Sequence, residues 1–193
     1  MQTPELLLRQ FASVNSIFHT VADDLSDEEW VTRLLPETNL PGFDLWHVAR
    51  TQDWALRTLV QGVPEVISEP QWAGKGALAT PGIGVGMTQA EADALAHRVA
   101  KADVLLYADT VHAKLLTWLS SIDGLMLDSA PDIQAHYRTH PEYRTPAMRA
   151  EVPWTAEHPS VWRCLMPALG HARDHLAEVD LLKRFWRRQQ GSL

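Results

Sequence analysis

The stretch that decides the fold is residues 161–186, VWRCLMPALGHARDHLAEVDLLKRFW. Apolar residues recur in it at steps of three and four, the spacing of one face of an α-helix. This line of side chains comprises Val161, Leu165, Ala168, His171, His175, Val179, Leu182 and Trp186. Because the line is apolar except at the two histidines, it predicts a long helix that turns both imidazoles toward the protein interior. The helix is expected to run from Pro159 to Arg188, with a kink or a split at Pro167.

Three further segments with helical periodicity precede this helix. Residues 4–24 carry one apolar face, and residues 44–60 form a second helix that ends before a glycine. A third helix is predicted from Thr88 to about Leu119, with a capping box at its start and a break near Lys101. Four long amphipathic helices predict an all-α protein, namely a four-helix bundle.

Two irregular stretches, residues 61–87 and 121–157, join these helices and are rich in proline and glycine. Within them only residues 63–68 and 149–154 have the pattern of short extended pieces. The run GIGVGM at residues 82–87 has no strand before it and no lysine-serine end, so it does not predict a phosphate-binding loop. The two stretches are therefore expected to be the long crossover connections of the bundle.

Composition limits the classes of protein to which this chain can belong. The chain has 193 residues, of which 46% are apolar, so residues 1–193 are expected to form one globular domain. No segment approaches the ~20 apolar residues of a membrane span, and the N-terminus does not read as a secretory signal. The net charge of −7 disfavours nucleic acid as a partner. The single cysteine, Cys164, excludes a disulfide framework and fits a reducing cytoplasm, where we expect the protein.

His171 and His175 form the motif HARDH in the last helix. Residues four apart in a helix lie about 5–6 Å apart on one face, so both imidazoles can reach one metal ion. Burying two imidazoles is costly unless their nitrogens are satisfied, and a cation satisfies two at once. The alternative is a pair of core histidines bonded to the backbone or to acids such as Asp174 and Glu178. This pair alone leaves both interpretations open.

Two other histidine positions bear on the metal hypothesis. His136 and His140 have the same spacing, but they lie between prolines in a short polar segment, which predicts a loop or surface turn without a metal role. His47 lies in the second helix. Packed helices are about 8–10 Å apart, a distance that facing imidazoles bridge through one metal ion. His47 is therefore a candidate third ligand, although spacing alone does not place it opposite His171.

Taken in order, these motifs resemble the DinB-like superfamily over essentially the whole chain. The resemblance is carried by Asn39 in a loop, by Trp46 and His47 in the second helix, and by HARDHLAEVDLLKR at residues 171–184. It implies a four-helix bundle of up-down-down-up connectivity and a homodimer. It also implies a metal triad, which falls on His47, His171 and His175. Three neutral imidazoles suit Zn, Ni, Fe or Cu, so the metal is one divalent ion whose identity stays open.

The resemblance implies more than one activity. Members of the superfamily include thiol-dependent transferases and isomerases that use mycothiol or bacillithiol, and others are described as hydrolases. We therefore expect a metal-dependent thiol transferase that acts on an electrophilic small molecule. The alternatives are a metal-dependent hydrolase, a non-catalytic stress or ligand-binding protein with a structural metal, and a metal-free scaffold that dimerises.

Other chemically versatile residues are given weaker roles. Cys164 is expected to be inert core, because it lies in an apolar part of the last helix. No general base is assured, and the acids near the triad in sequence are Asp44, Asp53 and Asp174. Five tryptophans could wall an apolar cavity beside the metal, although aromatic residues are equally expected in a helical core. They are Trp46, Trp54, Trp118, Trp154 and Trp162.

Overall fold

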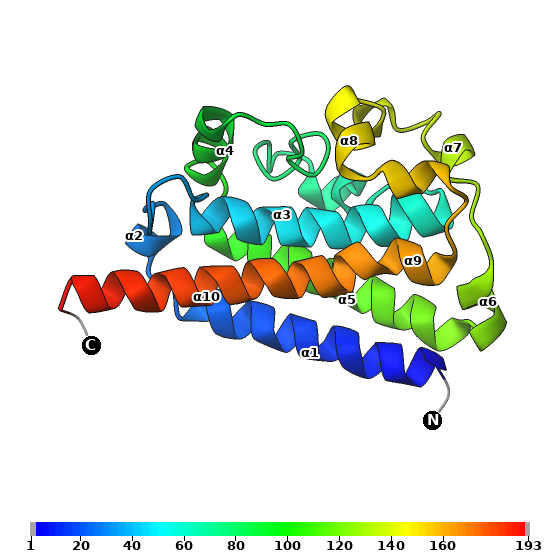
Figure 1. The fold of residues 1–193 in the computed structure, drawn as a ribbon, viewed down its shortest axis with the longest axis horizontal. Coiled ribbons are helices and arrows are strands. Elements are labelled where there is room, and N and C mark those ends of the chain that lie inside the picture. The colour runs from blue at the N-terminus through cyan, green and yellow to red at the C-terminus, as the bar shows by residue number, and fades with distance from the viewer. Residues whose placement is uncertain (1–2, 192–193) are drawn as a thin grey trace.

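A computed structural model of the chain describes residues 3–191 (Figure 1). Helices of all kinds make up 70% of these residues, and no strand occurs among them. The all-α class predicted from the apolar periodicity is therefore confirmed. The two segments expected to allow extended pieces are instead irregular and helical, because residues 66–68 form a 3₁₀ turn and residues 146–151 a short α-helix.

Four long helical segments pack side by side and enclose the core (Figure 1). Contacts join α1 to α5, α5 to α3, α3 to α10, and α10 back to α1. The segments are α1 (Thr3–Asp23), α3 (Pro41–Asp53) with the π-helix η1 (Trp54–Gln61), α5 (Lys101–Ser121), and α9 (Val161–Met166) with the π-helix η6 (Pro167–His171) and α10 (Ala172–Gln189). This arrangement agrees with a bundle of helices, and the up-down-down-up order expected from the resemblance stays a prediction.

Short helices occupy the stretches between the long ones. Between the first two long segments lies α2 (Asp27–Trp30). The first crossover contains η2 (Val66–Ser68), η3 (Pro70–Trp72) and α4 (Gln89–Ala96), and the second contains α6 (Gly124–Asp128), α7 (Ile133–His136), η4 (Pro141–Tyr143), α8 (Pro146–Glu151) and η5 (Pro153–Ala156). Figure 1 shows the first crossover and α8 on the side of α3 that is remote from α1. These connections therefore lie over α3.

Local signals placed most helix boundaries correctly. Thr88 forms its capping box with Glu91, and a non-helical stretch separates α4 from α5 just before Lys101, as predicted. Gly62 ends η1 in the left-handed conformation with φ of 62°, which glycine adopts without strain. The second helix begins at Pro41, three residues earlier than expected, because proline is favoured in the first turn of a helix. The last helix begins at Val161 rather than Pro159, with the Ser160 hydroxyl as its cap.

Pro167 separates the α-helical turns of α9 from those of α10, in line with the split expected from sequence. It opens the π-helical turn η6, which continues directly into α10. Across this turn the buried face still advances in steps of three and four, from Leu165 and Ala168 into α10. In α10 this face consists of Ala172, Leu176, Val179 and Lys183.

The predicted inward orientation of both histidines in the last helix is therefore wrong. His171 is exposed and His175 is partly buried. Both lie beside the core line and face α3 across a cavity that opens to solvent.

Within the described part of the chain, no helix is long and apolar enough to cross a membrane.

Candidate metal centre

His47 lies in the second turn of α3, and its side chain is buried. Its Nδ1–H donates a hydrogen bond to the backbone carbonyl of Ile83 in the first crossover, with an Nδ1···O distance of 2.5 Å. A histidine that donates from Nδ1 to a carbonyl keeps the lone pair on Nε2, and this arrangement is common for metal-ligating histidines. The fold therefore presents His47 with its Nε2 atom available as a ligand.

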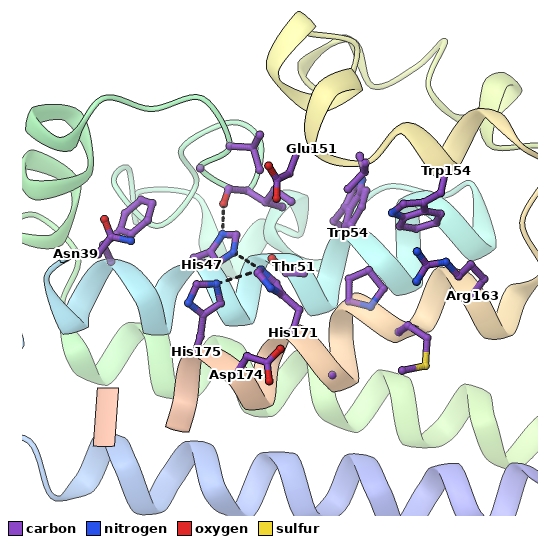
Figure 2. Close-up of a pocket in the computed structure, with 18 residues that line it drawn as sticks. Asn39, His47, Thr51, Trp54, Glu151, Trp154, Arg163, His171, Asp174 and His175 are labelled. Atoms are coloured by element: carbon purple, nitrogen blue, oxygen red, sulfur yellow. Dashed lines mark hydrogen bonds between the residues drawn. The ribbon is translucent and has the colours of Figure 1, made fainter. Parts of the chain in front are cut away.

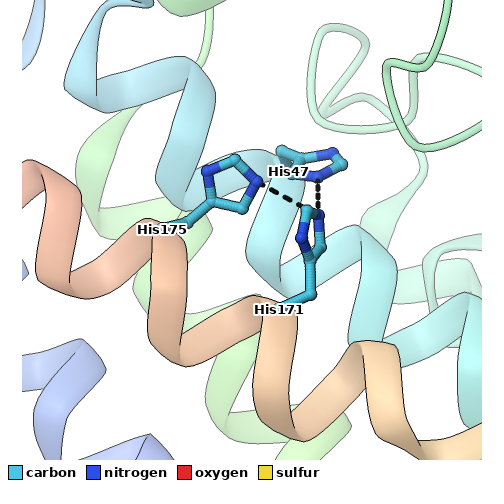
Figure 3. Close-up of side chains that lie close together, drawn as sticks. All are labelled: His47, His171 and His175. Atoms are coloured by element: carbon cyan, nitrogen blue, oxygen red, sulfur yellow. Dashed lines mark hydrogen bonds between the residues drawn. The ribbon is translucent and has the colours of Figure 1, made fainter.

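The other two histidines bring their Nε2 atoms to the same point (Figure 3). The Nε2 atom of His171 lies 3.0 Å from Nε2 of His47 and 3.1 Å from Nε2 of His175. The three potential ligand atoms all lie within 4.8 Å of one another. The structure thus places together the three residues that the sequence singled out, two from the last helix and one from α3.

Hydrogen bonds alone cannot satisfy this arrangement. A neutral imidazole has one N–H and one acceptor nitrogen. If Nε2 of His171 donates to His47, it has no lone pair in the ring plane to accept from His175. One cation at the centre would accept all three lone pairs. With bonds of about 2.1 Å at right angles, ligand nitrogens lie about 3.0 Å apart, so the two separations measured from Nε2 of His171 fit one ion.

The surroundings keep these imidazoles neutral, which is the form that binds a metal. Burial lowers the pKa of His47 from its ordinary value of 6.5 to about 3, and the nearby imidazole of His175 lowers it further. Burial also lowers the pKa of His175 to about 4 and lowers the pKa of His171. The Nδ1 atom of His175 is buried and has no hydrogen-bond partner among the described residues. Proton uptake is therefore disfavoured, and metal binding does not have to displace protons at neutral pH.

The turn that carries Ile83 is fastened to α3 by two contacts. Arg50 lies one helical turn after His47, and its Nε and Nη2 atoms donate to the carbonyl of Gly82 at 3.2 and 3.1 Å. Gly84 has φ of 94°, and an added Cβ atom would lie 2.8 Å from the ring of Phe43. Glycine is thus required for the turn to approach α3 this closely. Sequence reasoning missed this role of the GIGVGM run, although its glycines were the available signal.

The three histidines lie at one end of a cavity of about 560 Å³ (Figure 2). This volume is in the range of sites for small molecules. The walls come from α3 and η1, the GIGVGM turn, the second crossover and the last helix. The apolar part of the lining comprises Phe43, Trp54, Ile83, Val85, Val152, Trp154, Met166 and Pro167. The polar part comprises Asn39, Thr51, Glu151, Arg163 and Asp174.

The three acids that are near the triad in sequence occupy different positions in the structure. Asp174 lines the cavity. Asp44 is buried and accepts a hydrogen bond from Asn39 at 2.9 Å, and burial raises its pKa to about 7. Asp53 belongs to a buried polar cluster away from the histidines. Glu151, which sequence reasoning did not single out, lines the cavity as well, because the second crossover folds back over α3.

The remaining candidates separate into core and surface. His136 contacts the carbonyl of Leu59, and His140 contacts Glu142, so this pair belongs to turns and not to the histidine cluster. Cys164 is fully buried, and burial raises the pKa of its thiol to about 12, as expected for an inert core residue.

Of the five tryptophans considered, two line the cavity, namely Trp54 and Trp154. Trp46 is buried and donates to a backbone carbonyl of the first crossover. Trp118 lies along surface grooves near η1, and Trp162 is exposed. The aromatic wall of the cavity is therefore smaller than the composition suggested.

No protein-family model matches this chain, and no curated protein matches it in sequence. The geometry of the chain itself therefore carries the description of the site: an all-helical protein with a histidine cluster that could hold a metal ion.

Proposed function

We propose that this protein is a metal-dependent thiol transferase that joins a low-molecular-weight thiol to an electrophilic small molecule. The observation that carries the proposal is the convergence of three Nε2 atoms at one end of a cavity of about 560 Å³. The group has three histidine members, so an ion with four or more ligands would keep positions for other molecules.

The donor set favours a divalent transition metal such as Zn, Ni or Fe, since neutral imidazoles suit these ions and hard oxygen-binding ions prefer carboxylates. When bound, the ion would lower the pKa of a thiol or a water molecule in its remaining positions, which supplies a thiolate for transfer or a hydroxide for hydrolysis. The hydrogen bond from His47 to Ile83 would hold one ligand in its binding orientation.

The residues of the cavity have separate tasks in this reaction. The carboxylates of Asp174 and Glu151 lie at the cavity surface and can accept the proton that the thiol loses. The aromatic and aliphatic walls bind the carbon skeleton of the electrophile and reduce its contact with water. A carbon–sulfur bond then forms, and the leaving group departs with its electron pair. No protein nucleophile is required, which agrees with the burial of Cys164.

Two considerations favour transfer over the alternatives. The histidine motifs resemble the DinB-like superfamily, whose members include thiol-dependent transferases and isomerases. A purely structural metal would need full protein ligation or a closed surface, whereas the histidine cluster lies on an open cavity. Hydrolysis remains the second candidate, because the same open positions admit water and two carboxylates line the cavity.

Incubation of the metal-loaded protein with a thiol and an electrophile tests the proposal. Bacillithiol, mycothiol and glutathione would each be combined with monobromobimane, and the thioether would be measured by chromatography. We expect a rate above the protein-free reaction for at least one thiol, and no increase for His171→Ala. Equal rates with and without the loaded protein for every thiol would contradict transfer, and hydrolysis of ester substrates would then support the second candidate.

The wider setting also stays a proposal. We place the reaction in the cytoplasm, where small thiols are kept reduced. We also propose a small-molecule substrate and a homodimer, both taken from the resemblance. Light scattering of the purified protein tests the dimer.

A further inference from the structure

One basic side chain lines the cavity at a distance from the histidines. Arg163 lies on α9 and is the only lysine or arginine among the lining residues. Its guanidinium carbon lies 4.7 Å from the centre of the Trp154 ring, a cation–π distance. Figure 2 shows this pair at the end of the cavity remote from His47, with Trp54 between them and the histidines.

The guanidinium of Arg163 has no acidic partner. Eight arginine or lysine side chains of the described residues form ion pairs with Asp or Glu, and Arg163 is not one of them. Figure 2 shows the two acids that line the cavity, Glu151 and Asp174, on the side of His171 and away from Arg163. The cavity is therefore acidic beside the histidines and basic at the opposite end, with apolar walls between.

We propose that Arg163 is an anion-binding residue for the small molecule that occupies this cavity, and that the anion is a carboxylate. A guanidinium offers paired N–H donors that match the two oxygens of a carboxylate. The cation–π contact with Trp154 restrains the guanidinium, so less side-chain freedom is lost when the anion binds. A single cation in a cavity with two carboxylates suits a monoanion better than a phosphate dianion.

The position of Arg163 also sets the length of this ligand. Arg163 precedes His171 by eight residues, which is about 12 Å along a helix axis at 1.5 Å per residue. The ligand is thus an elongated molecule with a carboxylate at one end, an apolar middle and a metal-binding group at the other. The identity of that second end rests on the proposed function, and the carboxylate end rests on Arg163 and Trp154 alone.

Binding of two matched pairs of probes tests the proposal. The first pair is 6-mercaptohexanoate and 6-mercaptohexanol, and the second is suberic monohydroxamic acid and octanohydroxamic acid, so each pair differs in its terminal carboxylate. Affinities for the Co(II)-loaded protein would be read from the absorption of the ion. The variants are Arg163→Met, which keeps the stem against Trp154, and Arg163→Lys, which keeps the charge but not the fork. Arg184→Gln is the control, since Arg184 is exposed on α10 and does not line this cavity.

We expect the carboxylate probe of each pair to bind the wild type at least tenfold more tightly than its neutral partner. Arg163→Met should remove this preference, Arg163→Lys should retain part of it, and Arg184→Gln should keep it. Equal affinities within both pairs in the wild type, or a preference that survives Arg163→Met, would overturn the proposal. If neither thiol binds but the hydroxamates show the preference, the anion site stands and the thiol-transferase proposal falls.

Discussion

Helix α3 contributes to two polar clusters that differ in how their hydrogen-bonding groups are satisfied. One is the histidine cluster, defined by His47, His171 and His175. The other, here called the arginine cluster, comprises Arg50, Asp53, Thr58, Glu65, Tyr107 and Tyr143. Although His47 and Arg50 are only three residues apart, the first cluster opens to a cavity and the second is closed inside the protein.

The arginine cluster leaves none of its polar groups without a partner. Asp53 accepts hydrogen bonds from the amides of Val66 and Ile67 at 2.9 and 3.1 Å, and from the hydroxyl of Tyr107. Glu65 pairs with Nη2 of Arg50 at 2.8 Å and also accepts from Thr58 and Tyr143. A cluster of this kind is complete without a ligand, and it fastens the first crossover to α3.

The histidine cluster, in contrast, leaves some of its polar groups without hydrogen-bond partners among the described residues. Its three Nε2 atoms meet with too few protons to bond one another, and Nδ1 of His175 has no hydrogen-bond partner among the described residues. The comparison shows that proximity of polar groups is not the mark of a binding site. The mark is convergence of groups that the protein itself leaves unsatisfied.

Breaking the arginine cluster should give the largest effect on stability. Glu65→Ala leaves the guanidinium of Arg50 buried with one acidic partner fewer, so we expect a loss of about 3–5 kcal/mol in the free energy of unfolding. Urea denaturation of the metal-free protein measures it. His171→Ala, which changes an exposed side chain, serves as the comparison and should cost far less. A loss below about 1 kcal/mol for Glu65→Ala would show that this cluster does not hold the fold.

Adding metal should make the histidine cluster contribute to stability as well. An ion that binds only the folded state stabilises it by about 2.7 kcal/mol at a concentration of 100 times Kd. Thermal denaturation with and without the ion should therefore show a higher Tm for the wild type and no change for His47→Ala or His175→Ala. A metal-dependent increase in either variant would mean that the ion binds elsewhere.

The pH dependence of metal binding should be weak between pH 7.5 and 5.5. Protons and the ion compete for the same lone pairs, and the pKa of His47 and His175 lies at about 3 and 4, below the ordinary value of 6.5. A lowered pKa moves the loss of affinity to lower pH. We expect titrations with Co(II) to show nearly constant affinity down to pH 5.5. Exposed histidines would lose about tenfold each over this range, so a loss of that size would contradict the burial of the site.

Cys164→Ala should produce the smallest effect. The thiol is buried, does not line the cavity and has a pKa raised to about 12, so it takes no part in either cluster. We expect unchanged metal content and thiol-transfer rate, and a loss of about 1 kcal/mol in stability from the vacated volume. Abolished transfer in a folded, metal-loaded variant would identify Cys164 as a nucleophile.

Sequence periodicity predicted the helices and the pair His171 and His175, and the family resemblance implied His47 as the third histidine, but neither predicted the shape of the site. The predicted core line stepped three residues from Ala168 to His171, and so placed His171 and His175 inside the bundle. In the structure the buried face steps four residues from Ala168, to Ala172 and then to Leu176, which leaves the imidazoles beside a cavity.

Other features depended on tertiary contacts. The carbonyl of Ile83 orients His47, and Glu151 lines the cavity. Both residues lie in connections between the long helices, and no local sequence pattern specifies the paths of these connections. The Arg50–Glu65 pair joins residues on either side of the glycine that ends η1. Such contacts depend on the path of the crossover and not on the periodicity of a helix.

Metal stoichiometry is the measurement that tests the central claim most directly. Protein purified without a nickel column would be reconstituted with Zn, dialysed against a mild chelator and analysed by mass spectrometry for bound metal. The account predicts about one ion per chain for the wild type. It predicts none for His47→Ala, His171→Ala and His175→Ala, and full content for the matched pair His136→Ala and His140→Ala. Metal retained by the first three variants, or lost from the last two, would contradict the assignment of the metal to the histidine cluster.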